Sequence, residues 1–356
     1  MEGATAAPDL GVMGHDPHPC LDTSRVLMND VAAFRPIPPI RTTPVRSWLA
    51  ERYGIDVANA RCVARLDCEI YRLSVPGVPD RALRIYPPRI RDATAIADEV
   101  NWLVALGAEG LHVPTPQPAL DGSFIQPWPD GRLAVVLSWV GGRLLDKALR
   151  PVHLRRVGRL AGTMHRVAER MVASGQIVGQ RLGDGDGPDL TTWADGSRAP
   201  HPAMPQAAHQ RVQAAARRLI DELASFPRDP SAWGFLHADL HPWNLLFNGT
   251  AAGAIDFSEC GYGHHALDLA AALQYLKHPV VGNHDHAPLY PHHRDALLEG
   301  YAEERNLPPG IERQLDAYIE IRMVNTIEWV LDCWPTLDER PWGRGFLQRA
   351  GEYFAD

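Results

Sequence analysis

The chain has 356 residues, of which 45% are hydrophobic and 22% charged, so it can bury a sizeable core and has the balance of an ordinary globular protein. Its net charge of −8 argues against general binding to nucleic acid, which needs a surplus of basic residues. The sequence contains no apolar run of roughly 18 residues and no secretory signal pattern, and its five cysteines form no C-x-x-C pair, so we expect a cytoplasmic protein with free thiols.

The first part of the chain is predicted to be rich in strands. Residues 1–40 are rich in Pro, Asp and small residues, and we expect an N-terminal extension there. Beyond them, helical patterns and β-like runs alternate with turns that contain Pro and Gly. The expected helices cover residues 44–53 and 92–106, and the expected strands cover residues 61–66, 70–75, 81–86, 123–126 and 133–140.

The second part is predicted to be mainly helical. Residues 175–205 are rich in Gly, Asp and Pro, and we expect a long loop over them. Helical spacing of apolar residues predicts helices over 152–174, 206–225, 265–276, 292–304, 311–332 and 343–353. A strand-rich part followed by a helical part predicts an α+β fold with two lobes, an N-lobe over 41–138 and a C-lobe over 139–356.

The most informative stretch covers residues 233–270. It begins with a short apolar strand and a polar loop, continues with an apolar strand over 245–247 and a glycine turn, and reaches a third expected strand over 254–257. Strands that carry polar residues at their ends give those residues fixed positions around one point. This stretch is therefore where we expect the chemistry.

Four polar residues of this stretch match the catalytic loop and the metal-binding acid of kinases. His237-x-Asp239 followed by Asn244 fits the H-x-D-x-x-x-x-N pattern, and Asp256 lies in the third strand. Phosphoryl transfer needs a carboxylate that orients the acceptor hydroxyl, and an amide oxygen and a second carboxylate that hold Mg²⁺ across the phosphates. We assign the first task to Asp239 and the second to Asn244 and Asp256. His237 is expected to hold the catalytic loop or the backbone at Asp256 rather than to act as a base.

The same stretch resembles the aminoglycoside phosphotransferase and choline kinase superfamily, especially its homoserine-kinase-like branch. The resemblance covers roughly residues 45–335 and rests on the segments ALRIY, ADEVNWLVAL, VPTP, LSWVGG, GFLHADLHPWNLLF and AIDFSECGYGHHALDLA. It implies a protein-kinase-like fold, with a small β-rich N-lobe that has one main helix and binds nucleotide. The larger helical C-lobe would carry the catalytic loop and the acceptor site. The motif around Asp239 identifies the superfamily and not the acceptor.

By that resemblance, Arg84 in ALRIY takes the place of the basic strand residue that pairs with phosphate, and Glu99 is its partner on the following helix. Most kinases have lysine there, but a guanidinium is always charged and can also grip phosphate. The alternative is an exposed strand arginine that pairs with any acid. The turn over 66–69 contains no glycine, so a glycine-rich loop over the phosphates is not indicated.

LSWVGG resembles the segment that joins the two lobes, where backbone groups near Ser138 and Val140 would bind a purine. Backbone contacts leave no side-chain signature, so ATP and GTP both stay open as the co-substrate. An ordinary buried strand that ends at a glycine turn fits the same residues.

Acceptor-binding side chains are expected from the helical lobe. The candidates are an acid just after the metal-binding strand and three residues of the helix over 311–332, namely Glu259, Glu320, Glu328 and Trp329. A buried apolar stripe with solvated acids is the competing interpretation of that helix. Asp268 could bind a cationic substrate, but a structural role is favoured, in which it caps a helix or anchors the catalytic loop. The histidines over 278–293 lack the spacing of zinc ligands, so no zinc site is predicted.

These features together predict a kinase that moves the γ-phosphoryl group of ATP or GTP, with Mg²⁺, to a hydroxyl of a small molecule. An antibiotic of the aminoglycoside or nucleoside type, in a resistance or self-resistance role, is the first expectation for the acceptor. A metabolite kinase for homoserine, choline or a sugar, a bacterial stress-type protein Ser/Thr kinase and a nucleotide-binding pseudokinase are the alternatives. We expect a monomer or homodimer, without a nucleic-acid or membrane partner.

Overall fold

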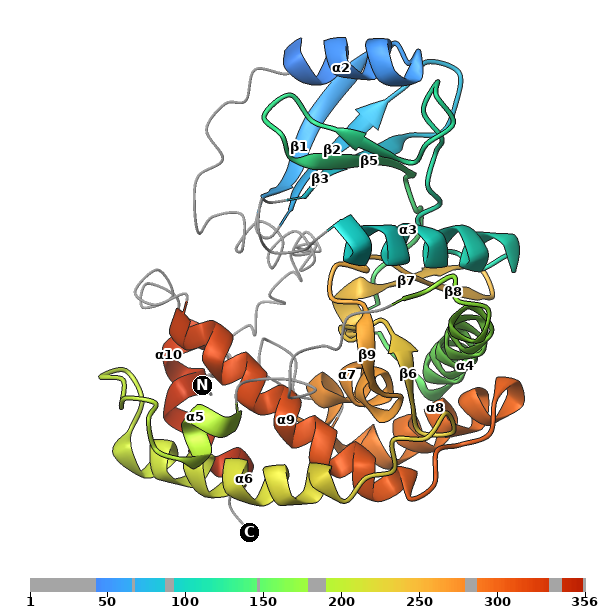
Figure 1. Cartoon of the computed structure of the whole chain (residues 1–356). Coiled ribbons are helices and arrows are strands. Elements are labelled where there is room, and N and C mark those ends of the chain that lie inside the picture. The colour runs from blue at the N-terminus through green and yellow to red at the C-terminus, as the bar shows by residue number, and fades with distance from the viewer. Residues whose placement is uncertain are drawn as a thin grey trace, which may run out of the picture.

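A computed structural model describes residues 43–65, 68–86, 93–145, 148–178, 190–278, 287–332 and 341–354. Two lobes are visible, a small one built on a sheet and a larger helical one (Figure 1). The predicted extension over 1–40 and residues 66 and 67 of the turn over 66–69 lie outside the described residues. Among the helices that are described, none has both the length and the apolar character needed to cross a membrane.

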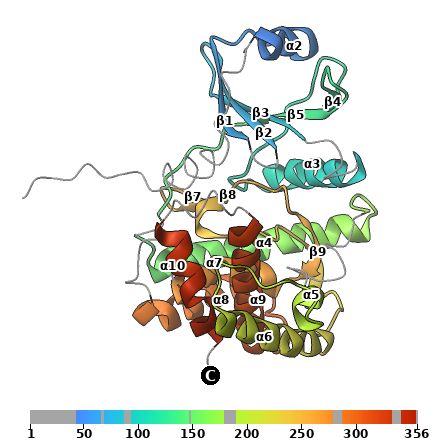
Figure 2. The ribbon, with the colours of Figure 1, turned by 90° about the vertical axis from the view of Figure 1, so that its left-hand side faces the viewer.

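The small lobe contains an antiparallel sheet with the strand order β1-β2-β3-β5-β4. Its strands are β1 (Asn59–Arg65), β2 (Glu69–Ser74), β3 (Arg81–Ile85), β4 (Ile125–Pro127) and β5 (Leu133–Ser138). Two helices flank it, α2 (Thr43–Tyr53) on one side and α3 (Ala93–Ala108) on the other (Figure 2). The predicted elements of this lobe are confirmed within about two residues, the usual uncertainty of element ends.

The alternation of side chains along β3 explains why Arg84 faces the second lobe. Leu83 and Ile85 belong to the small core that also contains Trp48 of α2. Because successive side chains of a strand point to opposite faces, Arg84 lies on the face toward α3, next to its cross-strand partner Val135. Val135 belongs to the large core that continues into the helical lobe.

The helical lobe is built from α4 (Pro151–Ala173), α5 (Leu190–Ala194), α6 (Gln206–Ala224), α7 (Ala266–Lys277), α8 (Tyr290–Glu304), α9 (Ile311–Asp332) and α10 (Pro341–Arg349). The helices α4 and α8 approach each other closely at two glycines. A Cβ atom on Gly158 would lie 2.0 Å from the Leu297 carbonyl oxygen, and one on Gly300 would lie 1.9 Å from the Arg155 carbonyl oxygen. Only glycine permits this backbone contact.

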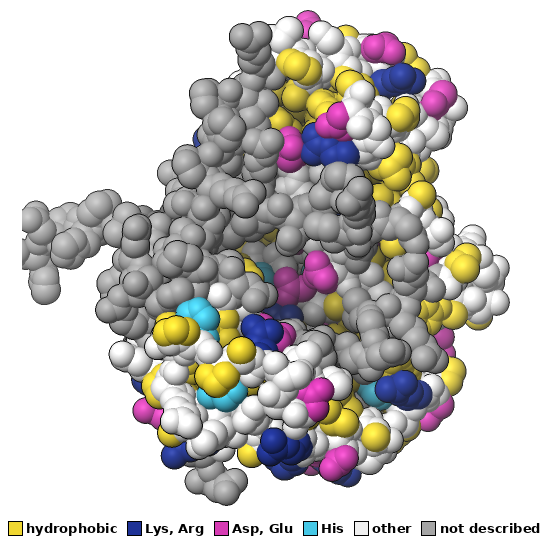
Figure 3. Space-filling model, turned by 60° about the vertical axis from the view of Figure 1, so that its left-hand side comes forward, with side chains coloured by type: hydrophobic (Ala, Val, Ile, Leu, Met, Phe, Trp, Pro, Cys, Tyr) yellow, Lys and Arg dark blue, Asp and Glu magenta, His cyan; other side chains and the backbone are white. Residues whose placement is uncertain are grey.

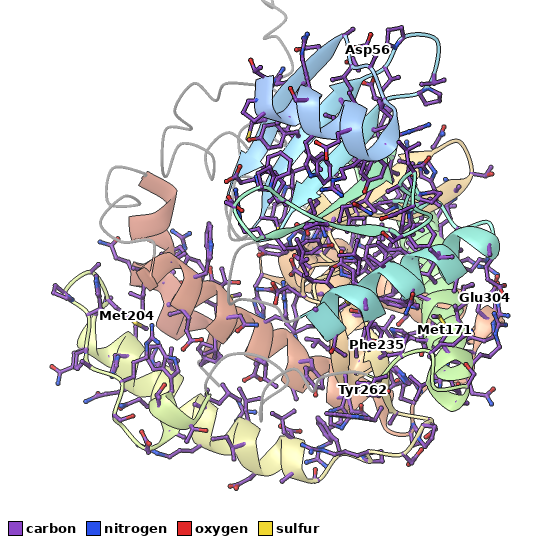
Figure 4. All side chains as sticks on the ribbon, turned by 45° about the horizontal axis from the view of Figure 1, so that its top comes forward. Asp56, Met171, Met204, Phe235, Tyr262 and Glu304 are labelled. Carbon is purple, nitrogen blue, oxygen red and sulfur yellow. The ribbon has the colours of Figure 1, made fainter. Side chains whose placement is uncertain are left out.

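Two short ribbons lie where the lobes meet. In one, β6 (Trp233–Leu236) pairs with β9 (Gly261–His264), and in the other, β7 (Leu245–Asn248) pairs with β8 (Ala251–Ala254). Phe235 and Tyr262 are opposite each other in the first ribbon, with ring centroids 5.7 Å apart (Figure 4). The predicted catalytic loop, residues 237–244, connects β6 of the first ribbon to β7 of the second.

Three predictions of local structure were wrong. The expected strand over 254–257 ends at Ala254, because Asp256 has a φ of 61°, which an extended strand cannot contain. The strand β9 was not predicted, since two of its four residues are glycine, which weakens a strand pattern. The expected loop over 175–205 contains the short helix α5, and its residues 179–189 lie outside the described part of the chain.

Candidate active site

The segment that follows β6 forms a tight loop closed by Asn244. The Asn244 side-chain amide donates to the backbone oxygen of Asp239 at 2.9 Å and to its Oδ2 at 3.2 Å. The backbone N–H of His241 also donates to the Asp239 carbonyl oxygen, at 2.9 Å. The two residues assigned from the sequence to acceptor orientation and metal binding are therefore in direct contact.

Asp268, in the first turn of α7, binds the backbone of this loop. Its Oδ1 accepts the N–H of Ala238 at 2.7 Å, and its Oδ2 accepts the N–H of His237 at 3.0 Å. Ala238 has a φ of 67°, a conformation that L-residues with a side chain rarely adopt. Of the two roles considered for Asp268, the structure shows the anchoring of the catalytic loop.

A buried relay continues behind Asp268. Its Oδ2 also accepts a hydrogen bond from Nε2 of His165 at 2.9 Å, and Nδ1 of His165 lies 3.0 Å from the Tyr301 hydroxyl. Burial raises the pKa of Asp268 to about 6, against the opposing effects of His237 and the two backbone N–H groups. Burial also lowers the pKa of His165 to about 3, with help from the charges of Arg305 and His237. At neutral pH the pair is thus a carboxylate and a neutral imidazole.

His237 is fully buried and faces the interior of the lobe. Its Nε2 lies 3.0 Å from the carbonyl oxygen of Ile255, and its ring packs on Phe257 with centroids 4.5 Å apart. These contacts join the catalytic loop to the segment that carries Asp256. The geometry thus favours the supporting role over that of a base.

Asp256 faces the space between the lobes, with 40% of its side chain exposed. Its Oδ1 accepts hydrogen bonds from Ser258 Oγ at 2.8 Å and from Nη2 of Arg84 at 3.0 Å. The backbone N–H of Ile255 donates to the Asn244 carbonyl oxygen at 2.9 Å, which brings Asn244 and Asp256 side by side. Acidic side chains gather in the hollow of this face (Figure 3).

The donor set of Asn244 and Asp256 fits Mg²⁺. One carboxylate and one carboxamide offer hard oxygen ligands, and Mg²⁺ at phosphate sites usually takes one or two carboxylates and completes its shell with phosphates and water. Within the described residues, no cluster of three or more His, Cys, Asp or Glu side chains could hold a metal ion. His284 and His286, which belong to the histidine-rich segment over 278–293, lie outside those residues.

Arg84 connects the two lobes. Its Nη1 donates to Oε1 of Glu99 on α3 at 2.8 Å, and Tyr86 donates to the same oxygen at 3.1 Å. Burial alone would lower the pKa of Arg84, but Glu99 and Asp256 raise it well above its ordinary value. The Arg84 side chain is 6% exposed, so the exposed strand arginine considered from the sequence is wrong.

Asp239 is surrounded by groups that keep it ionised. Burial would raise its pKa, but the neighbouring His241, Arg322 and His237 lower it to about 2. Arg322 of α9 donates from Nη2 to Oδ1 of Asp239 at 2.7 Å. This contact was missed in the sequence, where the only signal was one arginine among the apolar residues Ile321, Met323 and Val324.

The segment that joins the lobes follows β5. The Ser138 N–H donates to the Thr115 carbonyl oxygen at 2.8 Å, and its hydroxyl oxygen accepts the Thr115 N–H at 2.8 Å. Among the contacts between described residues, none uses the Val140 backbone. Of the two predicted purine-binding positions, Ser138 is therefore bonded to Thr115, and purine binding at Ser138 and Val140 stays a prediction.

Two acids proposed for acceptor binding have arginine partners. Glu320 forms an ion pair with Arg218 of α6. Glu328 accepts hydrogen bonds from Arg198 at 3.1 Å and from Trp193 Nε1 at 3.0 Å. Their binding to an acceptor stays a prediction, and in this structure both acids connect α9 to neighbouring segments of the lobe.

The two other acceptor candidates are accessible. Trp329 is 37% exposed near the C-terminal end of α9, and Glu259 is exposed three residues after Asp256. On α9, Trp329 lies two helical turns beyond Arg322 and on nearly the same face, since seven residues complete almost two turns. Along this face of α9, Trp329 therefore lies about two turns further from Asp239 than Arg322 does.

Comparison with known proteins places the chain in a family. A model of the phosphotransferase enzyme family matches residues 69–307. The amicoumacin kinase of Bacillus subtilis is 24% identical over 279 residues, which cover 77% of this chain and 80% of that protein. The homoserine kinase of Allorhizobium ampelinum is 29% identical over 209 residues, which cover 58% of this chain and 59% of that protein.

Solved structures show the same fold. An amicoumacin kinase in complex with AMP-PNP, Ca²⁺ and its antibiotic has a TM-score of 0.72 at 20% identity and covers 91% of this chain and 96% of its own. A spectinomycin phosphotransferase in complex with ADP and spectinomycin has a TM-score of 0.62 at 15% identity, with 89% and 98% covered. The predicted kinase-like fold and the predicted superfamily are confirmed. The chain therefore belongs to the phosphotransferase enzyme family.

Proposed function

We propose that this protein transfers the γ-phosphoryl group of ATP or GTP to a hydroxyl group of a small molecule, with an antibiotic as the first candidate acceptor. The observation that carries the proposal is the pair Asp239–Asn244 beside Asp256, with Arg84 and Glu99 joining this group to the small lobe. These are the parts that phosphoryl transfer requires, namely an orienting carboxylate, oxygen ligands for a metal ion and a cation for phosphate.

In the proposed reaction, Asp239 accepts the hydrogen bond of the acceptor hydroxyl and directs its oxygen at the γ-phosphorus. A new P–O bond forms to the acceptor, the bond to the β,γ-bridging oxygen of the nucleotide breaks, and the hydroxyl proton passes to Asp239 as the transfer completes. A carboxylate with a pKa of about 2 is a weak base. Asp239 thus acts chiefly by orienting the acceptor, as expected for a loose transition state.

Asn244 and Asp256 would hold Mg²⁺, which when bound compensates the negative charge of the β- and γ-phosphates. Arg84 has further N–H groups beyond those that bond to Glu99 and Asp256. Its Nε is buried and has no hydrogen-bond partner among the described residues, while Nη1 and Nη2 are bonded to Glu99 and Asp256. A phosphate oxygen of the nucleotide is the acceptor that we assign to this N–H, because unpaired buried donors are costly.

The likeness to the amicoumacin kinase, over 80% of that protein, supports an antibiotic as acceptor. A homoserine-type metabolite is the second candidate, because the homoserine kinase of Rhizobium etli is 33% identical over 205 residues. That match covers 57% of this chain and 58% of that protein, less of both than the match to the amicoumacin kinase covers.

A phosphotransfer screen tests the proposal. Purified protein is incubated with Mg²⁺ and either ATP or GTP and with amicoumacin, spectinomycin, hygromycin B, homoserine or aminopropanol, and phosphorylated products are identified by mass. We expect one acceptor class to be phosphorylated by the wild type and not by Asp239→Ala. A protein that binds Mg²⁺-nucleotide with all acceptors unmodified would be a pseudokinase, and the enzyme proposal would be wrong.

A further inference from the structure

A second arginine, Arg322 of α9, binds the catalytic loop. Its Nη2 donates to Asp239 Oδ1 at 2.7 Å, and its Nη1 lies 3.5 Å from the Ala238 carbonyl oxygen. The side chain of Arg322 is 11% exposed, so solvent screens this ion pair less than it screens a surface pair. The matched family model ends at residue 307, and α9 begins at Ile311, so Arg322 lies outside the matched residues while Asp239 lies within them.

The carboxylate of Asp239 is held at both ends. Arg322 occupies one direction at Oδ1, while at Oδ2 the Asn244 amide donates at 3.2 Å and His241 Nε2 lies 3.3 Å away. These contacts fix the rotation of the carboxylate. Each carboxylate oxygen has two lone-pair directions, so a direction at Oδ1 is still available for the acceptor hydroxyl.

Arg322 is itself held by α7. The buried Gln274 donates from Nε2 to the backbone oxygen of Arg322 at 3.0 Å and to Thr326 Oγ1 at 2.9 Å. Its Oε1 lies 3.4 Å from Arg322 Nε. The guanidinium therefore approaches Asp239 from a fixed helix rather than from a loop. A group on a rigid element can hold a reacting carboxylate to within the fraction of an ångström that catalysis requires.

We propose that Arg322 is a positioning residue for the transfer step, which acts through Asp239 and not through contact with the nucleotide. It fixes the direction of the Asp239 carboxylate and compensates its negative charge. The inference rests on the proposed function, because it assigns to Asp239 the orientation of the acceptor.

The competing interpretation is an ion pair that only stabilises the fold. Removal of Arg322 would then lower the melting temperature and the amount of active protein, and the remaining molecules would turn over at the normal rate. A positioning role predicts the opposite result: the folded variant binds nucleotide normally but transfers the phosphoryl group slowly. The two interpretations differ in kcat per folded molecule.

The test compares Arg322→Ala and Arg322→Lys with the wild type. Transfer is measured with an acceptor that passes the screen, and the slow hydrolysis of Mg²⁺-ATP by water is measured in parallel. Arg313→Ala is the matched control, because Arg313 is also on α9 and pairs with Glu222 of α6 at 2.8 Å, but it lies nine residues from Arg322. Guanidinium chloride at a non-denaturing concentration is then added to Arg322→Ala.

We expect Arg322→Ala to lower kcat about 100-fold, the cost of a slightly misplaced reacting group, with the nucleotide KM unchanged within about twofold. Added guanidinium should restore part of the rate in Arg322→Ala and none in Asp239→Asn, and Arg322→Lys should be intermediate. Arg313→Ala should keep the wild-type kcat. A kcat of Arg322→Ala close to the wild-type value, or a loss that neither guanidinium nor lysine restores, would overturn the inference.

The acceptor screen and this test can fail separately. If the wild type phosphorylates no acceptor, the proposed function fails, and the hydrolysis rate still reports whether Arg322 acts through Asp239. If transfer occurs and Arg322→Ala leaves kcat unchanged, the proposed function stands and the role of Arg322 does not.

Discussion

Two residues of the active site have backbone angles that are unfavourable for residues with a side chain. Ala238 has a φ of 67° and Asp256 a φ of 61°, and such conformations cost on the order of 1–3 kcal/mol each. Asp268 offsets this cost at Ala238 by accepting its N–H, and Arg84 and Ser258 hold the side chain of Asp256. The strain lies next to the carboxylates that we assign to catalysis.

Asp239→Asn tests the assignment of the orienting carboxylate. The amide keeps the shape of the side chain but loses the negative charge that accepts the acceptor hydroxyl, so kcat should fall by about three orders of magnitude or more. The melting temperature should also fall, because the low pKa of Asp239 and its ion pair with Arg322 stabilise the folded carboxylate form, so kcat is compared per folded molecule. Steady-state transfer assays check the rate, and a normal rate would remove Asp239 from the mechanism.

Arg84→Ala tests the phosphate grip. Because Arg84 joins Glu99 and Asp256, its loss removes the cation that neutralises the fully buried Glu99 carboxylate, so we expect weaker nucleotide binding together with a lower melting temperature. Arg84→Lys keeps the charge and should recover part of the affinity. The nucleotide KM and direct binding by calorimetry are the measurements. An unchanged nucleotide affinity in the folded alanine variant would contradict the assignment.

At the scale of elements, the helical lobe depends on the close contact of α4 and α8. Gly300 of α8 lies against the backbone of Arg155, and Gly158 of α4 lies against Leu297. α8 and α4 also provide Tyr301 and His165, which form the relay behind Asp268. A change in the distance between these two helices would therefore move His165 and Tyr301, which are linked to the catalytic loop through Asp268.

Gly300→Ala should destabilise the protein. Alanine in a helix is ordinarily better than glycine by up to about 1 kcal/mol, but here the new methyl group would overlap the Arg155 carbonyl oxygen, and overpacking costs about 1–3 kcal/mol or more. Gly141→Ala is the control, because a Cβ there meets no atom within 4 Å. Urea unfolding gives the comparison. Equal or greater stability of Gly300→Ala would mean that the helices separate readily.

At the scale of the whole molecule, buried histidines predict acid sensitivity. Burial lowers the pKa of His165 to about 3 and that of His278 to about 4, and it lowers the pKa of His265 well below its usual range. Below about pH 6.5 the unfolded chain takes up protons that the folded protein does not, so the free energy of unfolding falls as the pH falls. Asp268, with its raised pKa, opposes this loss between about pH 6 and 4.

His165→Gln should reduce the acid sensitivity. Each buried neutral histidine contributes about 1.4 kcal/mol per pH unit within its window, so the variant should lose less stability than the wild type between pH 6.5 and 5. The exposed His292→Gln is the control and should behave like the wild type. Urea midpoints at several pH values give the slopes, and equal slopes for all three proteins would show that His165 does not contribute.

The sequence by itself determined the fold class and identified the candidate site residues, because both depend on local signals. The alternation of apolar residues predicted the strands of the small lobe, and the spacing of Asp239 and Asn244 identified the catalytic loop within one segment. The assigned catalytic roles stay predictions. The sequence identified Asp256 as a candidate metal ligand. It did not predict the left-handed backbone conformation of Asp256, because the apolar residues around it favour a continued strand.

Only the tertiary structure decided which distant groups meet at Asp239. Arg322 is 83 residues from Asp239 in the chain, and His165 is 103 residues from Asp268. Such contacts are set by how α4, α7 and α9 pack, and neither charge pattern nor periodicity records that packing. The same holds for Glu320 and Glu328, whose arginine partners lie on other segments. Local spacing identified the candidate reactive residues, while helix packing decided which charges surround them.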